Sequence, residues 1–217
     1  MKKPFIIGFS GRKGSGKNTC ADVIQNYIIE NYPDYLKNPS RLATKIYAFA
    51  DAMKKVCHQF FGLTYEQCYG TNDQKNSPTL VKWENFPVKY LVPHEQEFMT
   101  SRELLQFFGT DIIRKMYDDA HVMALFHDII DHDNPRFALI NDARFSNEIS
   151  AIKRQGGKII RLTRAPFSND THPSETALDK ENYSWDNFDY IIDNINMTLE
   201  EQKQALITLV IQWRLFE

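Results

Sequence analysis

Short apolar runs alternate along the chain with longer segments whose apolar residues recur at helical spacing. The first run, 5–9, is apolar throughout and leads into a glycine-rich stretch, which is typical of a strand buried on both faces. Further strands are predicted at 45–50, 136–141, 158–163 and 188–192. Helices are predicted over 17–32, from Asp51 (as the cap) to about 60, from a cap at Thr100 or Ser101 to Met116, and over 120–130, 149–155 and 199–213.

This alternation predicts the fold class. A strand followed by a helix and then another strand favours a parallel sheet between two helical layers. We therefore expect an α/β protein, a three-layer α/β/α sandwich with a five-stranded parallel sheet. Ligands of such sheets bind at the carboxyl ends of the strands. The loops after the first four strands are therefore the expected location of the chemistry.

Length and composition fit one domain. The chain has 217 residues, and its 42% hydrophobic and 25% charged residues exclude a wholly disordered protein, a collagen and a coiled-coil rod. Within a single domain over 1–217 we expect an inserted lobe at about 63–99, where prolines and glycines interrupt any periodicity. A polar loop is expected at about 165–184.

The charge balance and the cysteines narrow the surroundings of the protein. A net charge of −2 gives no bulk positive field for nucleic acid or a membrane, although a local basic cleft stays open. The three cysteines lack CxxC spacing, and the amino-terminal apolar segment is too short for a secretory signal. Together these features predict reduced thiols and a cytoplasmic location. No apolar run reaches the roughly 20 residues that a membrane-spanning helix needs.

A glycine-rich turn between the first predicted strand and helix matches a phosphate-binding motif. The segment 11–17, Gly-Arg-Lys-Gly-Ser-Gly-Lys, satisfies the G-x-x-x-x-G-K part of the Walker A pattern. Backbone N–H groups of such a turn converge on phosphate oxygens, and the helix adds its positive end. The alternative is a turn that binds nothing. We name 11–17 the phosphate loop, and Lys17 is expected to supply a mobile cation for the β and γ phosphates.

Two positions point to Mg²⁺. Asn18 stands where Ser or Thr usually ligates the metal, and Thr19 follows it, so which of the two makes the contact stays open. An amide oxygen can approach Mg²⁺ or one of its waters, but less well than a hydroxyl. Asp142, at the end of the third strand, lies where a Walker B acid would orient the metal. A capping or turn aspartate is the alternative.

Further charged residues follow the second and third strands. Arg144 could clamp a second phosphate with two hydrogen bonds, or it could be solvated. Glu148 lies one helical turn beyond and could hold the side chain of Arg144. Lys54, in the helix after the second strand, could meet the phosphate of an acceptor or could be solvated.

The segment 102–111 combines an apolar face with a polar stripe. Arg102, Gln106 and the pair Gly109 and Thr110 recur at i, i+4 and i+7/8, so they share one side of a helix. Groups at this spacing can stack on a base and bind its edge, and an ordinary amphipathic surface helix is the alternative. Gly109 inside a helix is costly unless something approaches it closely.

Four blocks together resemble the bacteriophage deoxynucleoside monophosphate kinases. Because the second and the fourth block are far more particular than the phosphate loop, the resemblance extends well beyond a general nucleotide motif. Members of this family also commonly carry an acidic or amide residue after the Walker lysine, which suits Asn18. The blocks are Gly-Arg-Lys-Gly-Ser-Gly-Lys-Asn-Thr at 11–19, Arg-Glu-Leu-Leu-Gln-Phe-Phe-Gly-Thr-Asp at 102–111, Asn-Asp-Ala-Arg-Phe-Ser-Asn-Glu at 141–148 and Ser-Asn-Asp-Thr-His-Pro-Ser-Glu at 168–175.

The resemblance implies an enzyme that moves the γ-phosphoryl group of ATP to a deoxynucleoside 5′-monophosphate, with Mg²⁺. It implies catalytic roles for Lys13, Lys17, Asp142 and Arg144. The implied ATP contacts are Gly11, Gly14, Ser15, Gly16, Lys17, Asn18, Thr19, Arg164 and Asn194. The implied contacts of the acceptor are Lys13, Met53, Lys54, Arg102, Gln106, Gly109, Thr110, Arg144, Glu148 and His172. The loop 165–184 would be a lid with Arg164 at its hinge.

Several points stay open at this stage. His172 could touch phosphate from the lid or could fix the lid through hydrogen bonds, and the second role is preferred. Other possible functions are a small-molecule kinase such as one acting on dephospho-coenzyme A, a polynucleotide-end kinase, and a nucleotide-gated binding module without catalysis. Two copies of the chain could pair through the apolar residues of 104–130, although core packing explains these residues equally well.

Overall fold

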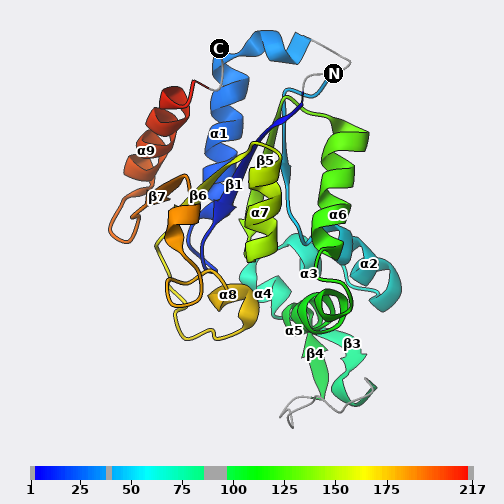
Figure 1. The fold of residues 1–217 in the computed structure, drawn as a ribbon. Coiled ribbons are helices and arrows are strands. Elements are labelled where there is room, and N and C mark those ends of the chain that lie inside the picture. Colours follow the sequence, from blue (N-terminus) through cyan, green and yellow to red (C-terminus); the bar gives the residue numbers. More distant parts are fainter. Residues whose placement is uncertain (1–2, 38–40, 86–96, 215–217) are drawn as a thin grey trace. The chain divides into compact units, whose positions relative to one another are not determined.

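A computed structural model describes residues 3–37, 41–85 and 97–214 (Figure 1). The chain forms two compact units. The sheet unit comprises Met1–Phe49 and Val122–Glu217, and the 50–121 unit comprises Ala50–His121. The second unit is thus wider than the lobe expected at 63–99, of which 86–96 lie outside the described residues.

The sheet unit is built on a five-stranded sheet whose pairings are all parallel, as predicted. The strand order is β2-β5-β1-β6-β7, so the first strand of the chain is the central strand of the sheet (Figure 1). In the register of the central strand, Ile7 lies opposite Leu139 and Phe9 lies opposite Ile160. The strands are β1 (Phe5–Ser10), β2 (Thr44–Tyr47), β5 (Phe137–Ala143), β6 (Lys158–Leu162) and β7 (Tyr190–Ile192).

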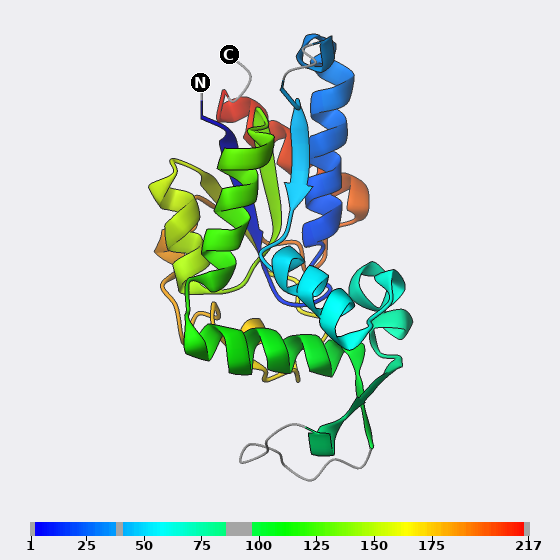
Figure 2. The same ribbon diagram turned by 90° about the vertical axis from the view of Figure 1, so that its right-hand side faces the viewer.

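Helices cover both faces of this sheet, which gives the predicted three layers (Figure 2). On one face, α1 (Lys17–Asn31) and α9 (Leu199–Gln212) pack on Ile7 and Phe9. On the other face, α6 (Ala120–His127) and α7 (Ser146–Arg154) pack on Ile6 and Ile140. Successive residues of β1 point to opposite faces. This alternation explains why its uninterrupted apolar run belongs to two separate cores.

Short elements complete the sheet unit. A 3-10 helix, Pro33–Lys37, follows α1, and a second one, Trp185–Asn187, precedes β7. The π-helix Asp128–Asp133 continues α6, where the sequence predicted an α-helix to residue 130. Helix α8 (Pro173–Thr176) lies in the polar loop 165–184 and begins with a proline at its first turn.

The 50–121 unit contains more regular structure than the sequence predicts for 63–99. Two of its short helices begin with capping boxes, Thr64 with Gln67 and Thr71 with Gln74. Its core contains Cys57, Leu63, Cys68, Met99 and Leu104. The elements are α2 (Asp51–Phe61), α3 (Tyr65–Tyr69), α4 (Asn72–Lys75), β3 (Pro78–Lys82), a 3-10 helix (Trp83–Asn85), β4 (Phe98–Thr100) and α5 (Ser101–Gln106), with β3 and β4 antiparallel.

Two predictions about the helices of this unit need correction. Asp51 is the first residue of α2, whereas Ala50 occupies the cap position. The helix that begins after β4 is α-helical only to Gln106 and continues as a π-helix, Phe107–Arg114. Its predicted start is confirmed, because Thr100 caps α5 in a capping box with Glu103.

Among the residues described, none of the helices is long and apolar enough to cross a membrane. All three cysteines are buried as free thiols.

Candidate active site

The phosphate loop joins β1 to α1 and depends on its glycines. Gly14 has φ +76° and Gly16 has φ +102°, in the left-handed region that residues with a side chain rarely adopt. A Cβ atom at Gly14 would lie 2.7 Å from Cγ of Pro166 in the lid. Gly16 is also the cap of α1, so the loop presents the amino-terminal end of that helix. This arrangement provides the anion-binding end that the motif predicts.

Lys17 is buried and folded back on the loop. Its Nζ donates to the carbonyl oxygens of Gly11 at 2.7 Å and Arg12 at 2.8 Å. The pKa of Lys17 is lowered to about 7, chiefly by burial and then by the nearby positive charge of Arg144, while Glu175 and Asp142 act in the opposite direction. The structure therefore brings Lys17, Asp142 and Arg144 into one electrostatic environment.

The end of β5 and the start of α7 position the predicted acid and arginine. Oδ1 of Asp142 accepts a hydrogen bond from the backbone N–H of Phe49 at 2.7 Å, which ties the ends of neighbouring strands together. The guanidinium of Arg144 pairs with Glu175 and donates to the carbonyl of Ser174 at 3.0 Å. Both contacts come from the lid.

Glu148 does not hold the side chain of Arg144, so this prediction is wrong. Its Oε2 accepts from the backbone N–H groups of Arg144 at 2.7 Å and Phe145 at 3.1 Å. The carboxylate thus caps the first turn of α7, where the helix dipole favours a negative charge. Glu148 is buried and fixes the main chain from which Arg144 extends.

The lid lies against the phosphate loop in this structure. Arg12 forms an ion pair with Asp179 at 2.5 Å and donates to the carbonyl of Ser168 at 2.8 Å. Nζ of Lys13 lies 4.8 Å from the ring centroid of Phe167, in cation–π geometry. The hinge is held as well, because Arg164 donates to the carbonyls of Asn194 at 3.0 Å and Met197 at 2.6 Å.

Asn194 is completely buried, and its side chain joins two parts of the site. Its Nδ2 donates to the carbonyl of Ser15 at 2.8 Å and to Gln202 at 2.7 Å, while its Oδ1 accepts from the N–H of Arg164 at 2.9 Å. Asn194 therefore connects the phosphate loop to the lid hinge. Contact of Asn194 with ATP stays a prediction.

The residues predicted for Mg²⁺ offer oxygen donors. Asn18 is exposed and Thr19 is partly exposed in the first turn of α1, and Asp142 is partly exposed at the end of β5. Amide, hydroxyl and carboxylate oxygens are the hard ligands that Mg²⁺ prefers. The chemistry of these residues fits that ion, which usually keeps several waters and takes few protein ligands.

His172 has the hydrogen bonds of a loop-fixing residue. Its Nδ1 lies 2.8 Å from Oγ of Ser174 and accepts from the backbone N–H of Ser174 at 3.2 Å. The side chain thereby caps α8. This is the role preferred from the sequence, and contact with a substrate stays a prediction.

The remaining predicted acceptor residues lie in the 50–121 unit. Arg102 donates to Asn76 at 2.8 Å and to Asn72 at 3.0 Å. Lys54 lies 3.8 Å from Asp51, and its Nζ is 4.5 Å from the ring centroid of Tyr69. Each cation thus has polar or aromatic neighbours within its own unit.

The predicted polar stripe along 102–110 is interrupted. Because the helix becomes a π-helix at Phe107, with more residues per turn, the spacing of an α-helix no longer applies to Gly109 and Thr110. Gly109 is buried, and a Cβ atom there would lie 3.1 Å from Cε of Met53. The close approach predicted at this glycine is therefore present, and it brings together two of the predicted residues. Gln106 and Thr110 are partly exposed.

Sequence reasoning missed three charged residues of this site. Arg161 is buried in β6, donates to Oγ of Ser10 at 2.9 Å and lies 3.4 Å from Asp179. The pKa of Arg161 is lowered to about 10, chiefly by burial; Asp179 raises it, and Arg12, the second arginine on Asp179, lowers it. A charged residue inside the apolar run 158–162 was a usable signal. Asp179 and Glu175 gave no such signal, since both lie in a polar loop.

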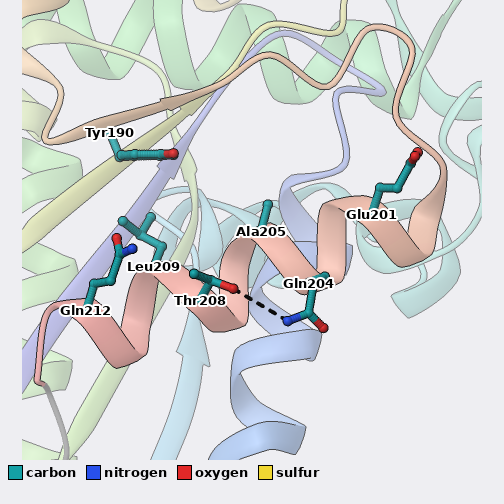
Figure 3. A pocket seen from close by; sticks show the side chains of 7 residues that line it. All are labelled: Tyr190, Glu201, Gln204, Ala205, Thr208, Leu209 and Gln212. Carbon is teal, nitrogen blue, oxygen red and sulfur yellow. Dashed lines mark hydrogen bonds between the residues drawn. The ribbon is translucent and has the colours of Figure 1, made fainter.

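A separate hollow of about 310 Å³ lies between β7 and α9 (Figure 3). It is lined by Tyr190, Glu201, Gln204, Ala205, Thr208, Leu209 and Gln212. In Figure 3, Gln204 and Thr208 bond to each other along the helix. The hollow contains none of the residues predicted for catalysis or for nucleotide binding.

Comparison with known proteins gives a consistent family. The family model described as deoxynucleotide monophosphate kinase matches residues 41–206. A protein of Acanthamoeba polyphaga mimivirus, provisionally named a deoxynucleotide monophosphate kinase, is 33% identical and covers 94% of this chain and 95% of its own length. The deoxynucleoside-5′-monophosphate kinase of Escherichia phage T5 is 26% identical over 66% of this chain and 69% of its own.

Solved structures are more distant. An APS kinase of Mycobacterium tuberculosis, as a Cys556Ala mutant, aligns with 97% of this chain and 99% of its own, with 10% identity and a TM-score of 0.41.

Proposed function

Because this chain belongs to the deoxynucleotide monophosphate kinase family, we propose that its phosphate loop, Asp142 and Arg144 carry the phosphoryl transfer. The protein is an ATP-dependent nucleotide kinase that forms a diphosphate from a deoxynucleoside 5′-monophosphate. The observation that supports this division of roles is the convergence of Lys17, Asp142 and Arg144 beside the loop, with the lid resting on it.

ATP binds with its phosphates at the phosphate loop in this proposal. The backbone N–H groups of the loop and of the first turn of α1 donate hydrogen bonds to phosphate oxygens. Lys17 turns from its two carbonyl partners to the β and γ phosphates. Gly11, Ser15, Asn18 and Thr19 line the same strand–helix turn. Ser15 supports the proposal further, because its Oγ is buried without a hydrogen-bond partner in the described structure.

The acceptor phosphate binds at Arg144, and Lys13 reaches the transferred group. The base and sugar contacts are assigned to Met53, Lys54, Arg102, Gln106, Gly109 and Thr110 of the 50–121 unit. Because the attacking group is already a phosphate oxygen, no strong base is required, and positioned cations supply most of the catalysis. The lid excludes water, which would otherwise accept the phosphoryl group.

Mg²⁺ belongs to the proposal. Asn18 or Thr19, together with Asp142, would hold the ion or its waters, and the bound ion would neutralise charge on the phosphates. Pairing of two chains and a cytoplasmic location stay predictions.

A substrate panel tests the function. ADP release is measured in a coupled assay with each deoxynucleoside monophosphate, with dephospho-coenzyme A and with 5′-hydroxyl oligonucleotides offered separately. We expect release with one or more deoxynucleoside monophosphates alone, and a loss of about 100- to 1000-fold in Lys17→Ala. Lys203→Ala, on the exposed surface of α9, serves as the matched control. Release with either of the other acceptors, and not with monophosphates, would contradict the proposal.

A further inference from the structure

Glu175 is a buried carboxylate that binds two different parts of the site. It lies in α8 of the lid, and its side chain is only 4% exposed. Oε2 accepts from the backbone N–H of Lys13 in the phosphate loop at 2.6 Å, and Oε1 pairs with the guanidinium of Arg144. A carboxylate buried to this extent is stable only when it is paired and hydrogen-bonded. These two contacts therefore depend on each other and on the seated lid.

The contact leaves part of the guanidinium available. Within the described residues, the hydrogen bonds of the Arg144 side chain, to Glu175 and to the carbonyl of Ser174, both use Nη1. Arginine has five N–H donors in a planar fork. Nε and Nη2 can therefore form the paired hydrogen bonds that a phosphate accepts, while Nη1 is held by the lid.

We propose that Glu175 is a positioning residue that fixes the guanidinium of Arg144 against the phosphate loop when the lid is seated. This inference rests on the proposed function of Arg144 as the acceptor-phosphate ligand. A long arginine side chain loses its rotational freedom when both its charge and its plane are held. Glu175 thus makes closure of the lid and correct placement of the acceptor phosphate a single event. Glu175 can position Arg144 in this way only while the lid is seated and its carboxylate accepts the hydrogen bond from the backbone N–H of Lys13.

The opposite role of Glu175 is also chemically defined. A carboxylate on an arginine and on a phosphate-loop amide can stand in for a phosphate and compete with it. The two roles predict opposite changes when the charge is removed. A positioning residue makes acceptor use worse when it is lost, whereas a competitor makes it better.

The test is Glu175→Gln, which keeps the size of the side chain and removes its charge. We expect kcat to fall by about 10- to 100-fold and the acceptor KM to rise, with the ATP dissociation constant within about threefold of the unaltered protein. In the double variant with Arg144→Ala, the loss should be no larger than in Arg144→Ala alone, because both changes remove the same arrangement. Glu181→Gln, an exposed carboxylate of the same lid, is the matched control and should behave as the unaltered protein.

The inference would be overturned by a lower acceptor KM in Glu175→Gln, by additive losses in the double variant, or by a parallel loss of ATP and acceptor affinity together with a lower melting temperature. If the glutamine variant does not fold, Glu175→Asp keeps the charge, shortens its reach and is judged by the same criteria. A defect in Arg144→Ala with a normal Glu175→Gln rejects the inference and leaves the proposed function intact. The absence of monophosphate-dependent ADP release from the unaltered chain rejects the proposed function itself.

Discussion

The phosphate loop with its lid and the predicted acceptor residues of the 50–121 unit are built in different ways. Around the loop, the contacts join residues that are far apart in the chain: Arg12 pairs with Asp179 across 167 positions, and the amide of Lys13 binds Glu175 across 162. In the 50–121 unit the partners are nearer, since Arg102 reaches Asn76 across 26 positions and Lys54 lies three residues from Asp51.

The difference reflects how firmly the side chains in each region must be held for the reaction. Groups that stabilise a transferring phosphoryl must be held before the reaction, because reorganisation during the reaction adds to the barrier. Long-range contacts of the lid with the phosphate loop and with Arg144 hold these residues only in the completed fold. The contacts proposed for the acceptor can instead tolerate local adjustment, and the flexible side chain of Met53 against Gly109 would suit that role.

Among the substitutions that test these two regions, Arg144→Ala is expected to have the largest effect. Arg144→Ala should reduce kcat/KM for the monophosphate by about 100-fold, because a charged donor to the reacting phosphate is lost. ATP affinity, measured by titration calorimetry, should change much less. The matched control Arg154→Ala removes an exposed arginine of α7 and should have no effect. Equal losses of ATP and monophosphate affinity in Arg144→Ala would contradict the assignment.

An intermediate effect is expected from pH, again at the loop. With a pKa of about 7 in the free protein, Lys17 is largely neutral above that pH. Phosphate binds the charged form, so binding takes up a proton, and ATP affinity should fall by up to about tenfold per pH unit from 7.5 upwards. The measurement is calorimetry between pH 7.5 and 9.5, where the charge of ATP itself changes little.

Lys17→Arg is the control for this pH dependence. Its guanidinium stays charged throughout that range, so its ATP affinity should be flat with pH, whatever its absolute value. If the unaltered protein shows a flat profile as well, the buried lysine is not the group that titrates.

The smallest effect is expected at Gly109, in the region built from nearby residues. In Gly109→Ala the new methyl group meets the flexible end of Met53, which must move by a few tenths of an ångström. The better helix propensity of alanine offsets this cost, so the free energy of unfolding should change by less than about 1 kcal/mol. The monophosphate KM should rise about threefold, because the side chain assigned to the acceptor is displaced.

Gly62→Ala gives the reverse pattern and serves as the control. Gly62 has φ +67°, and nothing lies within 4 Å of the place that a Cβ atom would take, so alanine there costs about 1 kcal/mol of stability without touching the substrate residues. Denaturant unfolding and KM are measured for both variants. An unchanged KM in Gly109→Ala would remove Met53 and Gly109 from the acceptor assignment.

Local patterns in the sequence were sufficient for the layers of the fold and for the phosphate loop. Hydrophobic periodicity gave the five parallel strands and the helices on both faces, because burial dictates the spacing of apolar residues. The spacing of glycines and lysine gave the strand–turn–helix of the loop, because the whole motif lies within a few residues. The start of α5 was also predicted, with Thr100 or Ser101 as the cap, because a cap lies next to the helix that it begins, and the structure has Thr100 in this place.

Only the tertiary structure decided which charges meet. Nothing near Arg144 in the sequence indicates that Glu175 is its partner. The sequence also does not indicate that Glu148 binds the main chain, or that Asn194 is fully buried. Nor does helical periodicity reveal the π-helix that moves Gly109 out of the polar stripe. The physical reason is that a long-range ion pair depends on where separate elements pack, whereas sequence spacing describes geometry only within one element.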